Sequence, residues 1–295
     1  MNASKRAVVF LGLSLAVSGC NRILATRIIE SPTIGGKIAL AVKAGKGRID
    51  ARRRVASADG VEIDLWVLKA RRGGPVAARN ATAVVIHPLM TSKSWFLSLG
   101  RQLADDGWDV VLPDLRAHGA SGGKYVTWGA KEKHDVKTAV DSLIAEGLVG
   151  PRIYAMGASL GGCVALQYAA IEPRCAGVLA IASPTGVKDV SRMLFPLATK
   201  GWLDETIMHA GEIAGFDPSD ASAIDAAGKL KCPLVLVHGR LDIIVPHSHS
   251  ERIYAAASGP RELISRGLLN HTTIQVGQNA WIVRRMSALA GMKAP

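Results

Sequence analysis

Short apolar runs alternate with helical patterns along most of the chain, and this alternation limits the folds open to it. Near-continuous apolar runs occur at Ala81–His87, Trp108–Asp114, Arg152–Gly157, Ala176–Ser183 and Pro233–Gly239. Such runs predict strands covered on both faces, as in a parallel sheet. Patterns typical of helices lie between them, over 95–106, 131–147 and 160–172. Strands that alternate with helices predict an α/β fold with helices on both faces of a mostly parallel sheet.

Upstream of these runs the pattern differs. Residues 61–68 alternate apolar and polar side chains, as a half-buried strand does, and residues 48–57 can pair with them through a turn at 58–60. Residues 185–231 contain two helical patterns, at 190–203 and 204–215, which leaves room for a small cap but for no large lid domain. We therefore expect one domain over 55–295 with a cap at about 185–231.

The first twenty residues have the layout of an export signal. Lys5 and Arg6 precede an uncharged apolar run from Ala7 to Val17, which is too short to span a bilayer as a helix, and small residues lead to Cys20. The end of this segment resembles the lipobox of bacterial lipoproteins, so we expect a signal peptide at 1–19 and lipid on Cys20. A plain cleaved signal and an uncleaved anchor are the alternatives. Lipid on Cys20 would hold the protein at a membrane of the cell envelope.

Residues 20–54 are strongly basic. They contain nine arginines and lysines against Glu30 and Asp50, within a chain whose net charge is +12. This segment is expected to tether the domain, either as a solvated linker or in contact with anionic lipid head groups. A nucleic-acid-binding arm is the rival interpretation, but no nucleic-acid module accompanies it, so no nucleic-acid partner is expected.

The other cysteines give little guidance. Cys163, Cys175 and Cys232 are an odd number without metal-type spacing, and apolar residues flank each of them. Buried free thiols are therefore expected, although an exporting compartment would permit one disulfide. No metal cluster or dinucleotide motif is visible, and no cofactor is expected.

Two serines lie in Gly-x-Ser-x-Gly patterns, and their contexts differ. Ser159 follows the predicted strand 152–157 at once and opens the predicted helix 160–172. A sharp strand-to-helix turn needs small residues such as Gly157 and Gly161, and it exposes the serine oxygen beside free N–H groups at a helix start. Ser121 comes seven residues after a strand, and no helix follows it. Ser159 is the candidate nucleophile, and Ser121 is expected to be a loop serine.

With these motifs in view, the chain resembles the α/β-hydrolase superfamily of serine hydrolases, in the group of lysophospholipases, monoglyceride lipases and serine aminopeptidases. The resemblance covers about Val55 to the C-terminus. Beside the elbow at Ser159, it rests on the loop "DLRAHGASGG" (114–123), on "HGRLDIIVP" (238–246) and on "LLNHTTI" (268–274). These motifs follow the order serine, acid, histidine that this fold uses.

The resemblance implies a role for each matching residue. Ser159 would be the nucleophile, His271 the base that takes its proton, and Asp242 the acid that orients the imidazole. His247 and His249 are the rivals to His271, but they lie too close to Asp242 in sequence to act as its usual base. The N–H groups of Leu160 and Leu89 would form the oxyanion hole, since Pro88 has no N–H.

The expected function is a membrane-anchored hydrolase of carboxylic esters, like a carboxylesterase or lysophospholipase, whose substrate is a small-molecule or lipid ester. A peptidase or thioesterase of the same fold, and a surface lipoprotein that binds without catalysis, are the alternatives. Apolar residues of the cap are candidates for an acyl pocket, although ordinary packing explains them as well; they are Met193, Leu194, Phe195, Trp202 and Met208.

Overall fold

The computed structural model describes residues 21–31, 48–71 and 79–292. In this part of the chain, eight strands form one sheet in the order β1-β2-β4-β3-β5-β6-β7-β8. The strands are β1 (Ala51–Ala56), β2 (Glu62–Leu68), β3 (Thr82–Ile86), β4 (Asp109–Pro113), β5 (Ile153–Ala158), β6 (Cys175–Ile181), β7 (Leu234–Gly239) and β8 (Arg261–Arg266). Strands β3 to β8 run parallel, whereas β1 and β2 form an antiparallel hairpin on the edge beside β4.

The sheet confirms the predicted alternation of strands and helices. All residues of β3, β5 and β7 are buried, as their continuous apolar runs predicted. The edge strand β8 was not predicted, because its sequence "RELISR" is largely polar and is half-buried to exposed. Such a sequence carries no apolar run, and only pairing with β7 makes it a strand.

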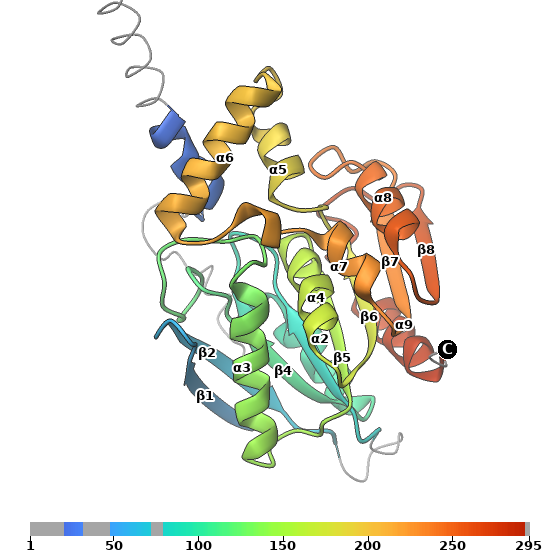
Figure 1. The fold of residues 1–295 in the computed structure, drawn as a ribbon. Coiled ribbons are helices and arrows are strands. Elements are labelled where there is room, and N and C mark those ends of the chain that lie inside the picture. Colours follow the sequence, from blue (N-terminus) through green and yellow to red (C-terminus); the bar gives the residue numbers. More distant parts are fainter. Residues whose placement is uncertain (1–20, 32–47, 72–78, 293–295) are drawn as a thin grey trace, which may run out of the picture.

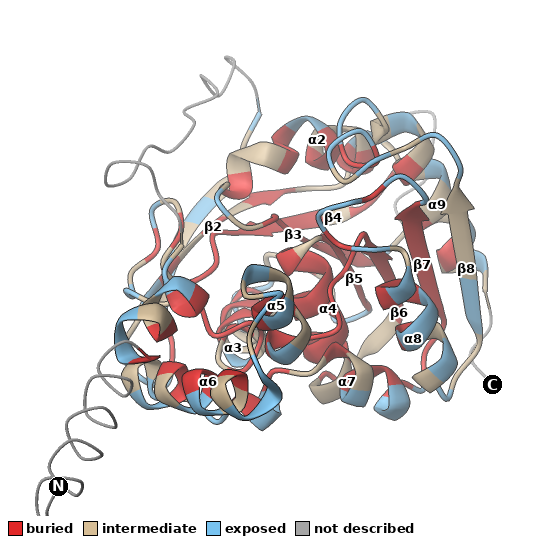
Figure 2. Ribbon diagram, turned by 90° about the horizontal axis from the view of Figure 1, so that it is seen from above, coloured by how far each residue is buried: buried red, intermediate tan, exposed pale blue. Residues whose placement is uncertain are grey.

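Helices cover both faces of the sheet (Figure 1). On one face lie the short helix η1 (Lys93–Phe96), α2 (Leu97–Asp105) and α9 (Asn279–Gly291), and on the other lie α3 (Glu132–Ala145), α4 (Leu160–Ile171), α7 (Ala223–Lys229) and α8 (Ser248–Ala256). Each face has its own apolar core. Residues 160–169 of α4 are all buried, because the sheet, α3 and α7 pack against this helix. Figure 2 shows this buried α4 in the middle of the molecule.

The cap lies between β6 and β7 and differs in detail from the prediction. It consists of α5 (Val187–Leu194), α6 (Lys200–Ala214) and the short η2 (Pro218–Asp220), followed by α7. The first predicted helical pattern, 190–203, is in fact broken: α5 ends before Pro196, and Thr199 caps a new helix by accepting a hydrogen bond from the Trp202 N–H. The two predicted patterns therefore fall on α5 and on one longer helix, α6.

The residues assigned to a tether do not all stand apart from the domain. Residues 21–29 are helical, and the segment 21–31 packs beside the cap with Ala25, Ile28 and Ile29 fully buried. Arg52–Arg54 belong to β1, so the sheet begins before the predicted boundary at Val55. The basic residues there lie on a strand whose side chains alternate in exposure. The predicted signal peptide, Cys20 and residues 32–47 lie outside the described residues.

The cysteines follow the expectation in part. Cys163 and Cys232 are buried free thiols, while Cys175 is only partly buried, and its sulfur lies 4.0 Å from that of Cys232. Burial raises the pKa of the Cys163 thiol to about 12. Among the described residues, helices are too short or too polar to cross a bilayer.

Arg116 joins three parts of the fold from the loop after β4. Its guanidinium is almost fully buried and donates two hydrogen bonds to Asp135 of α3, each of 2.7 Å, and others to Asp59 in the β1–β2 turn. Burial raises the pKa of the Asp135 carboxyl to about 6, against the lowering effect of Arg116. This arrangement fixes the loop 114–123 against the sheet.

We expect Arg116→Ala to reduce the free energy of unfolding by about 3–5 kcal/mol at pH 8, because it leaves the Asp135 carboxylate buried without a partner. At pH values between the ordinary pKa of 3.8 and the folded pKa of about 6, folded Asp135 binds more protons than unfolded Asp135. The contribution of this residue to the free energy of unfolding therefore falls as the pH rises. Without Arg116 the pKa of Asp135 rises further. At pH 5 the carboxyl is then largely neutral, so the difference in free energy of unfolding between variant and wild type should be smaller than at pH 8. Urea unfolding at both pH values measures this, and an equal loss at both would contradict it.

Candidate active site

Ser159 lies at the junction of β5 and α4 in a strained backbone conformation. Its φ and ψ are 52° and −122°, a region that residues with a side chain rarely adopt. The conformation is held from both sides: the Ser159 N–H donates to the Ile181 carbonyl on β6 at 2.8 Å, and its own carbonyl accepts from the Gly162 N–H at 2.9 Å. The side-chain oxygen thereby stays half-exposed at the end of the sheet.

Two glycines make this turn possible. A Cβ at Gly157 would lie 2.1 Å from the Gly161 carbonyl oxygen, and a Cβ at Gly161 would lie 2.1 Å from the Ile86 carbonyl oxygen at the end of β3. These distances are far inside van der Waals contact, and both obstacles are backbone atoms that cannot rotate away. The first turn of α4 can therefore pack against β5 because Gly157 lacks a side chain, and it can approach β3 because Gly161 lacks one.

The structure brings Ser159, His271 and Asp242 together from three distant parts of the chain. His271 Nε2 lies 3.0 Å from Ser159 Oγ, and His271 Nδ1 lies 2.7 Å from Asp242 Oδ2. The carboxylate can only accept, so Nδ1 carries a proton and donates it. Nε2 then has a free lone pair, and the Ser159 hydroxyl donates to it.

The Asp242 carboxylate is fully buried and held at both oxygens. Oδ1 accepts from the Ile244 and Val245 N–H groups at 3.0 and 2.8 Å, which leaves Oδ2 to face the imidazole of His271. Burial alone would raise the pKa of this carboxyl, but hydrogen bonds from His238, His271 and the Val245 N–H outweigh it and lower the pKa well below its ordinary value. Asp242 therefore remains an anion.

His238, near the end of β7, is a second histidine that contacts the acid, and the motif 238–246 gave it no role in the sequence-based prediction. Its Nε2 lies 2.8 Å from the Val245 carbonyl oxygen and 3.3 Å from Asp242 Oδ2, while its Nδ1 lies 2.6 Å from Ser250 Oγ. Both neighbours of Nε2 accept, so this nitrogen carries a proton directed at them. The spacing of four residues between His238 and Asp242 across a tight turn is the signal that could have indicated this contact.

His271 follows β8 in a loop with its own support. Asn270 Oδ1 accepts from the Thr272 and Thr273 N–H groups, each at 3.0 Å, which turns the chain at His271. Gly239 lets this loop pack on the end of β7, since a Cβ there would lie 2.1 Å from the Leu269 carbonyl oxygen. The loop is therefore fixed against the strand that leads to Asp242.

The two expected oxyanion donors lie in the same region as Ser159. Leu160 is the first residue of α4, and Leu89 lines the same cavity as Ser159. Neither N–H has a hydrogen-bond partner among the described residues. His87 holds the Leu89 loop: its Nε2 accepts from the Leu115 N–H at 3.0 Å, so its Nδ1 carries the proton and donates to the Pro88 carbonyl at 2.8 Å. Burial lowers the pKa of His87 well below its ordinary value, which keeps this pattern of donors.

Comparisons with known proteins agree with this architecture. The model of the serine aminopeptidase S33 family matches residues 77–212. Esterase Pf2001 of Pyrococcus furiosus has a similar structure, with a TM-score of 0.65 and 22% identity over 89% of this chain and 97% of that one. An acetyl xylan esterase from Paenibacillus sp. R4 gives a TM-score of 0.63 and 15% identity, over 83% of this chain and 90% of the other. The chain has the α/β-hydrolase fold.

A sequence relative adds no activity to this picture. The uncharacterized protein YqkD of Bacillus subtilis is 27% identical over 192 residues, which are 62% of this chain and 62% of YqkD. The elbow at Ser159 falls inside the family match, while Asp242 and His271 lie beyond its end. These two residues are therefore placed by the structure of this chain and by the order of motifs that the α/β-hydrolase fold uses.

The other serine and histidine candidates form hydrogen bonds with residues other than Ser159, His271 and Asp242. Ser121 is confirmed as a loop serine, because its hydroxyl donates to the Asp114 carbonyl and accepts from the Asp64 N–H. His247 contacts Ser265 and Glu251, and His249 contacts Thr185. Among the described residues, His271 alone of the histidines forms a hydrogen bond with Ser159.

A cavity of about 500 Å³ opens beside Ser159 on this α/β-hydrolase fold. Apolar side chains dominate its lining; besides Leu89 they are Ile28, Trp128, Pro184, Val190, Met193, Leu194, Ile243, Ile244, Val245 and Pro246. Of the predicted cap residues, Met193 and Leu194 line it, whereas Phe195, Trp202 and Met208 do not. The wall formed by the segment 21–31 was missed, because a basic stretch after an export signal suggested a linker.

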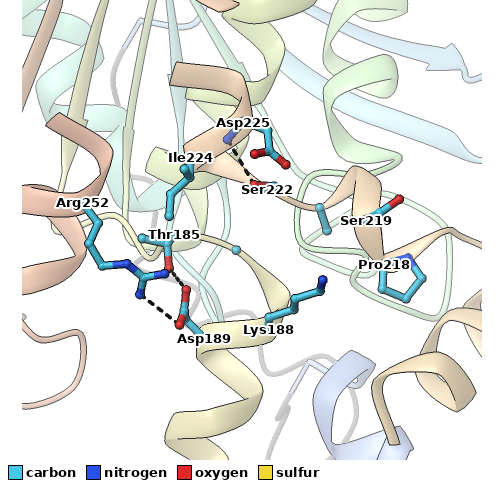
Figure 3. A pocket seen from close by; sticks show the side chains of 11 residues that line it. Thr185, Lys188, Asp189, Pro218, Ser219, Ser222, Ile224, Asp225 and Arg252 are labelled. Atoms are coloured by element: carbon cyan, nitrogen blue, oxygen red, sulfur yellow. Dashed lines mark hydrogen bonds and ion pairs between the residues drawn. The ribbon is translucent and has the colours of Figure 1, made fainter. Parts of the chain in front are cut away.

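A smaller hollow of about 260 Å³ lies at the base of the cap (Figure 3). Asp189 of α5 pairs with Arg252 of α8 at 3.0 Å and accepts a hydrogen bond from the Thr185 hydroxyl. Burial would raise the pKa of Asp189, but the hydrogen bonds from Arg252 and Thr185 outweigh it and lower the pKa. Because α8 follows the Asp242 loop, this contact fixes α5, and with it the cavity wall, relative to the acid.

We expect Gly161→Ala to destabilise the protein, lowering Tm by about 5 °C or more, because its Cβ would collide with the β3 backbone. Gly201→Ala is the matched control, since Gly201 lies near the start of α6 with open space around it. That variant should change stability by less than about 1 kcal/mol. Thermal unfolding of both variants decides the matter, and equal Tm values would refute the close-approach argument.

Proposed function

We propose that this protein is a serine hydrolase that cleaves carboxylic esters through an acyl-enzyme intermediate. The observation that carries the proposal is the continuous set of hydrogen bonds from Asp242 through His271 to Ser159, at an elbow that faces an apolar cavity. A protein that only binds its ligand does not require a serine hydroxyl 3.0 Å from an unprotonated imidazole nitrogen, whereas nucleophilic catalysis does.

The geometry supports the following sequence of steps. As Ser159 Oγ attacks the ester carbonyl carbon, its proton passes to His271 Nε2, and a tetrahedral oxyanion forms. When the carbon–oxygen bond to the alcohol breaks, His271 returns that proton to the leaving oxygen. Water then attacks the acyl-enzyme with His271 again as base, which releases the acid and restores Ser159. Asp242 stays ionised throughout and stabilises the imidazolium.

The Leu89 and Leu160 N–H groups are assigned to the oxyanion. Leu160 follows Ser159 directly and Leu89 lines the same cavity, and neither N–H has another partner in the described part of the chain, so both are available to a developing negative charge. His87 and Pro88 restrict the loop that carries Leu89. Such preorganised donors supply a large share of the stabilisation of the transition state.

Esters with an apolar acyl group are the proposed substrates. Most of the side chains that line the cavity are apolar, and two proteins of similar structure, esterase Pf2001 and the acetyl xylan esterase, are esterases. The family match to a serine aminopeptidase leaves a peptidase as second candidate. We further propose that lipid on Cys20 anchors the enzyme to a membrane, as the signal-like residues 1–19 suggest.

A fluorophosphonate probe tests the proposal, because it reacts with a serine that is activated by a base. We expect one adduct, on Ser159, in peptide mass analysis, and none in Ser159→Ala or His271→Ala. Ser121→Ala should be labelled like the wild type, which makes it a matched serine control. Faster cleavage of p-nitrophenyl esters than of aminoacyl anilides would support the esterase, and the reverse order would favour the peptidase. A folded wild type without adduct would refute both.

We expect Asp242→Asn to reduce kcat for a p-nitrophenyl ester by about 10⁴-fold. An amide can donate to His271 Nδ1, which would move the imidazole proton to Nε2 and remove the lone pair that faces Ser159. The effect should fall on kcat rather than on KM, because Asp242 is buried behind His271 and does not line the cavity. Steady-state kinetics measure this, and a loss confined to KM would contradict the assigned role.

A further inference from the structure

The segment 21–31 is docked to the domain by specific contacts. The Trp128 indole Nε1–H donates to the Ile28 carbonyl at 2.7 Å, and the Val126 N–H donates to the Ile29 carbonyl at 2.8 Å. These bonds satisfy carbonyls at the end of the helix, where no further turn can do so. With Ala25, Ile28 and Ile29 fully buried, the segment is part of the folded domain.

This segment forms one wall of the cavity beside Ser159. Arg27, Ile28 and Glu30 line it, facing a space that the cap bounds with Met193 and the acid loop bounds with Ile244. The segment lies before the family match, which begins at residue 77. The wall is therefore contributed by a part of the chain that the family match does not cover.

The residues of the wall differ in kind. Ile28 is apolar and 1% exposed, so it belongs to the closed part of the cavity. Arg27 and Glu30 are exposed, and neither forms an ion pair within the described residues, so they lie at the rim. An acyl chain long enough to fill the cavity of about 500 Å³ would meet Ile28, whereas an acetyl group is too small to fill it.

We propose that the segment 21–31 is a specificity element of the site, in which Ile28 limits the length of the acyl chain that the cavity accepts. The inference rests on the proposed ester hydrolysis and adds a determinant of its substrate class. Ile28 touches no reacting atom and leaves the hydrogen bonds of Ser159, His271 and Asp242 unchanged, so the effect falls on long acyl chains and spares short ones.

The test uses the full chain in detergent with p-nitrophenyl acetate, butyrate and octanoate. We expect Ile28→Trp to lower kcat/KM for octanoate at least tenfold, because the larger side chain would exclude about two methylenes and each buried methylene contributes about fourfold. The value of kcat/KM for acetate should change by less than about threefold. Ile28→Ala, which enlarges the cavity, should shift the preference toward octanoate. Ile23→Trp is the matched control, because Ile23 lies on the same helix, is 70% exposed and does not line the cavity.

The outcomes separate the two proposals. If the wild type takes no fluorophosphonate label and cleaves no ester, the proposed function fails. If label and acetate activity are normal but Ile28→Trp keeps the wild-type length profile, or loses all esters equally, only the specificity role is overturned. Where Ile28→Trp shows no thermal transition, Arg27→Trp tests the same wall from its exposed rim, and the same selective loss of octanoate is expected.

Discussion

The close approach of α4 to the end of β3 is the constraint on which the rest of the site depends. With Gly157 and Gly161 in place, the helix starts directly at Ser159 and the backbone there is forced to positive φ. Each supporting bond comes from a neighbouring strand or from the helix itself, so the sheet as a whole maintains the strain. The same turn places the Leu160 N–H directly after the hydroxyl and lets Ser159 face the cavity that the cap and the acid loop line.

Hydrogen bonds determine which buried groups of this site carry charge. Asp242 holds its negative charge because two histidines and two backbone N–H groups point at it. His87, equally buried, lacks an anionic partner and stays neutral as a spacer under the Leu89 loop. His238 and His87 are both buried, but His238 donates to a carboxylate whereas His87 contacts backbone groups. Their neighbours therefore determine their different roles.

Local patterns sufficed for the centre of the fold and for the hairpin of β1 and β2, but not for the opposite edge of the sheet or for contacts between distant segments. The buried strands, α4 and the elbow at Ser159 could be predicted, since each depends on a run of apolar residues or on a glycine at a fixed place. Strand β8 and the His238 contact could not, because pairing with β7 and the turn at Asp242 create them in space. The docking of the segment 21–31 depends on Trp128, about one hundred residues away, and no local pattern signals it.

The position of that segment has a consequence for how the proposed hydrolase would meet its substrate. Arg27 at the rim of the cavity lies about 9 Å along the helix from Asn21, the residue next to Cys20. If Cys20 carries the proposed lipid, the mouth of the cavity stands within about two helical turns of the bilayer surface. Encounter then becomes a two-dimensional search, and turnover depends on the number of ester molecules per unit of membrane area. Diluting such esters with inert lipid would slow the enzyme even while their amount per volume of solution stayed constant.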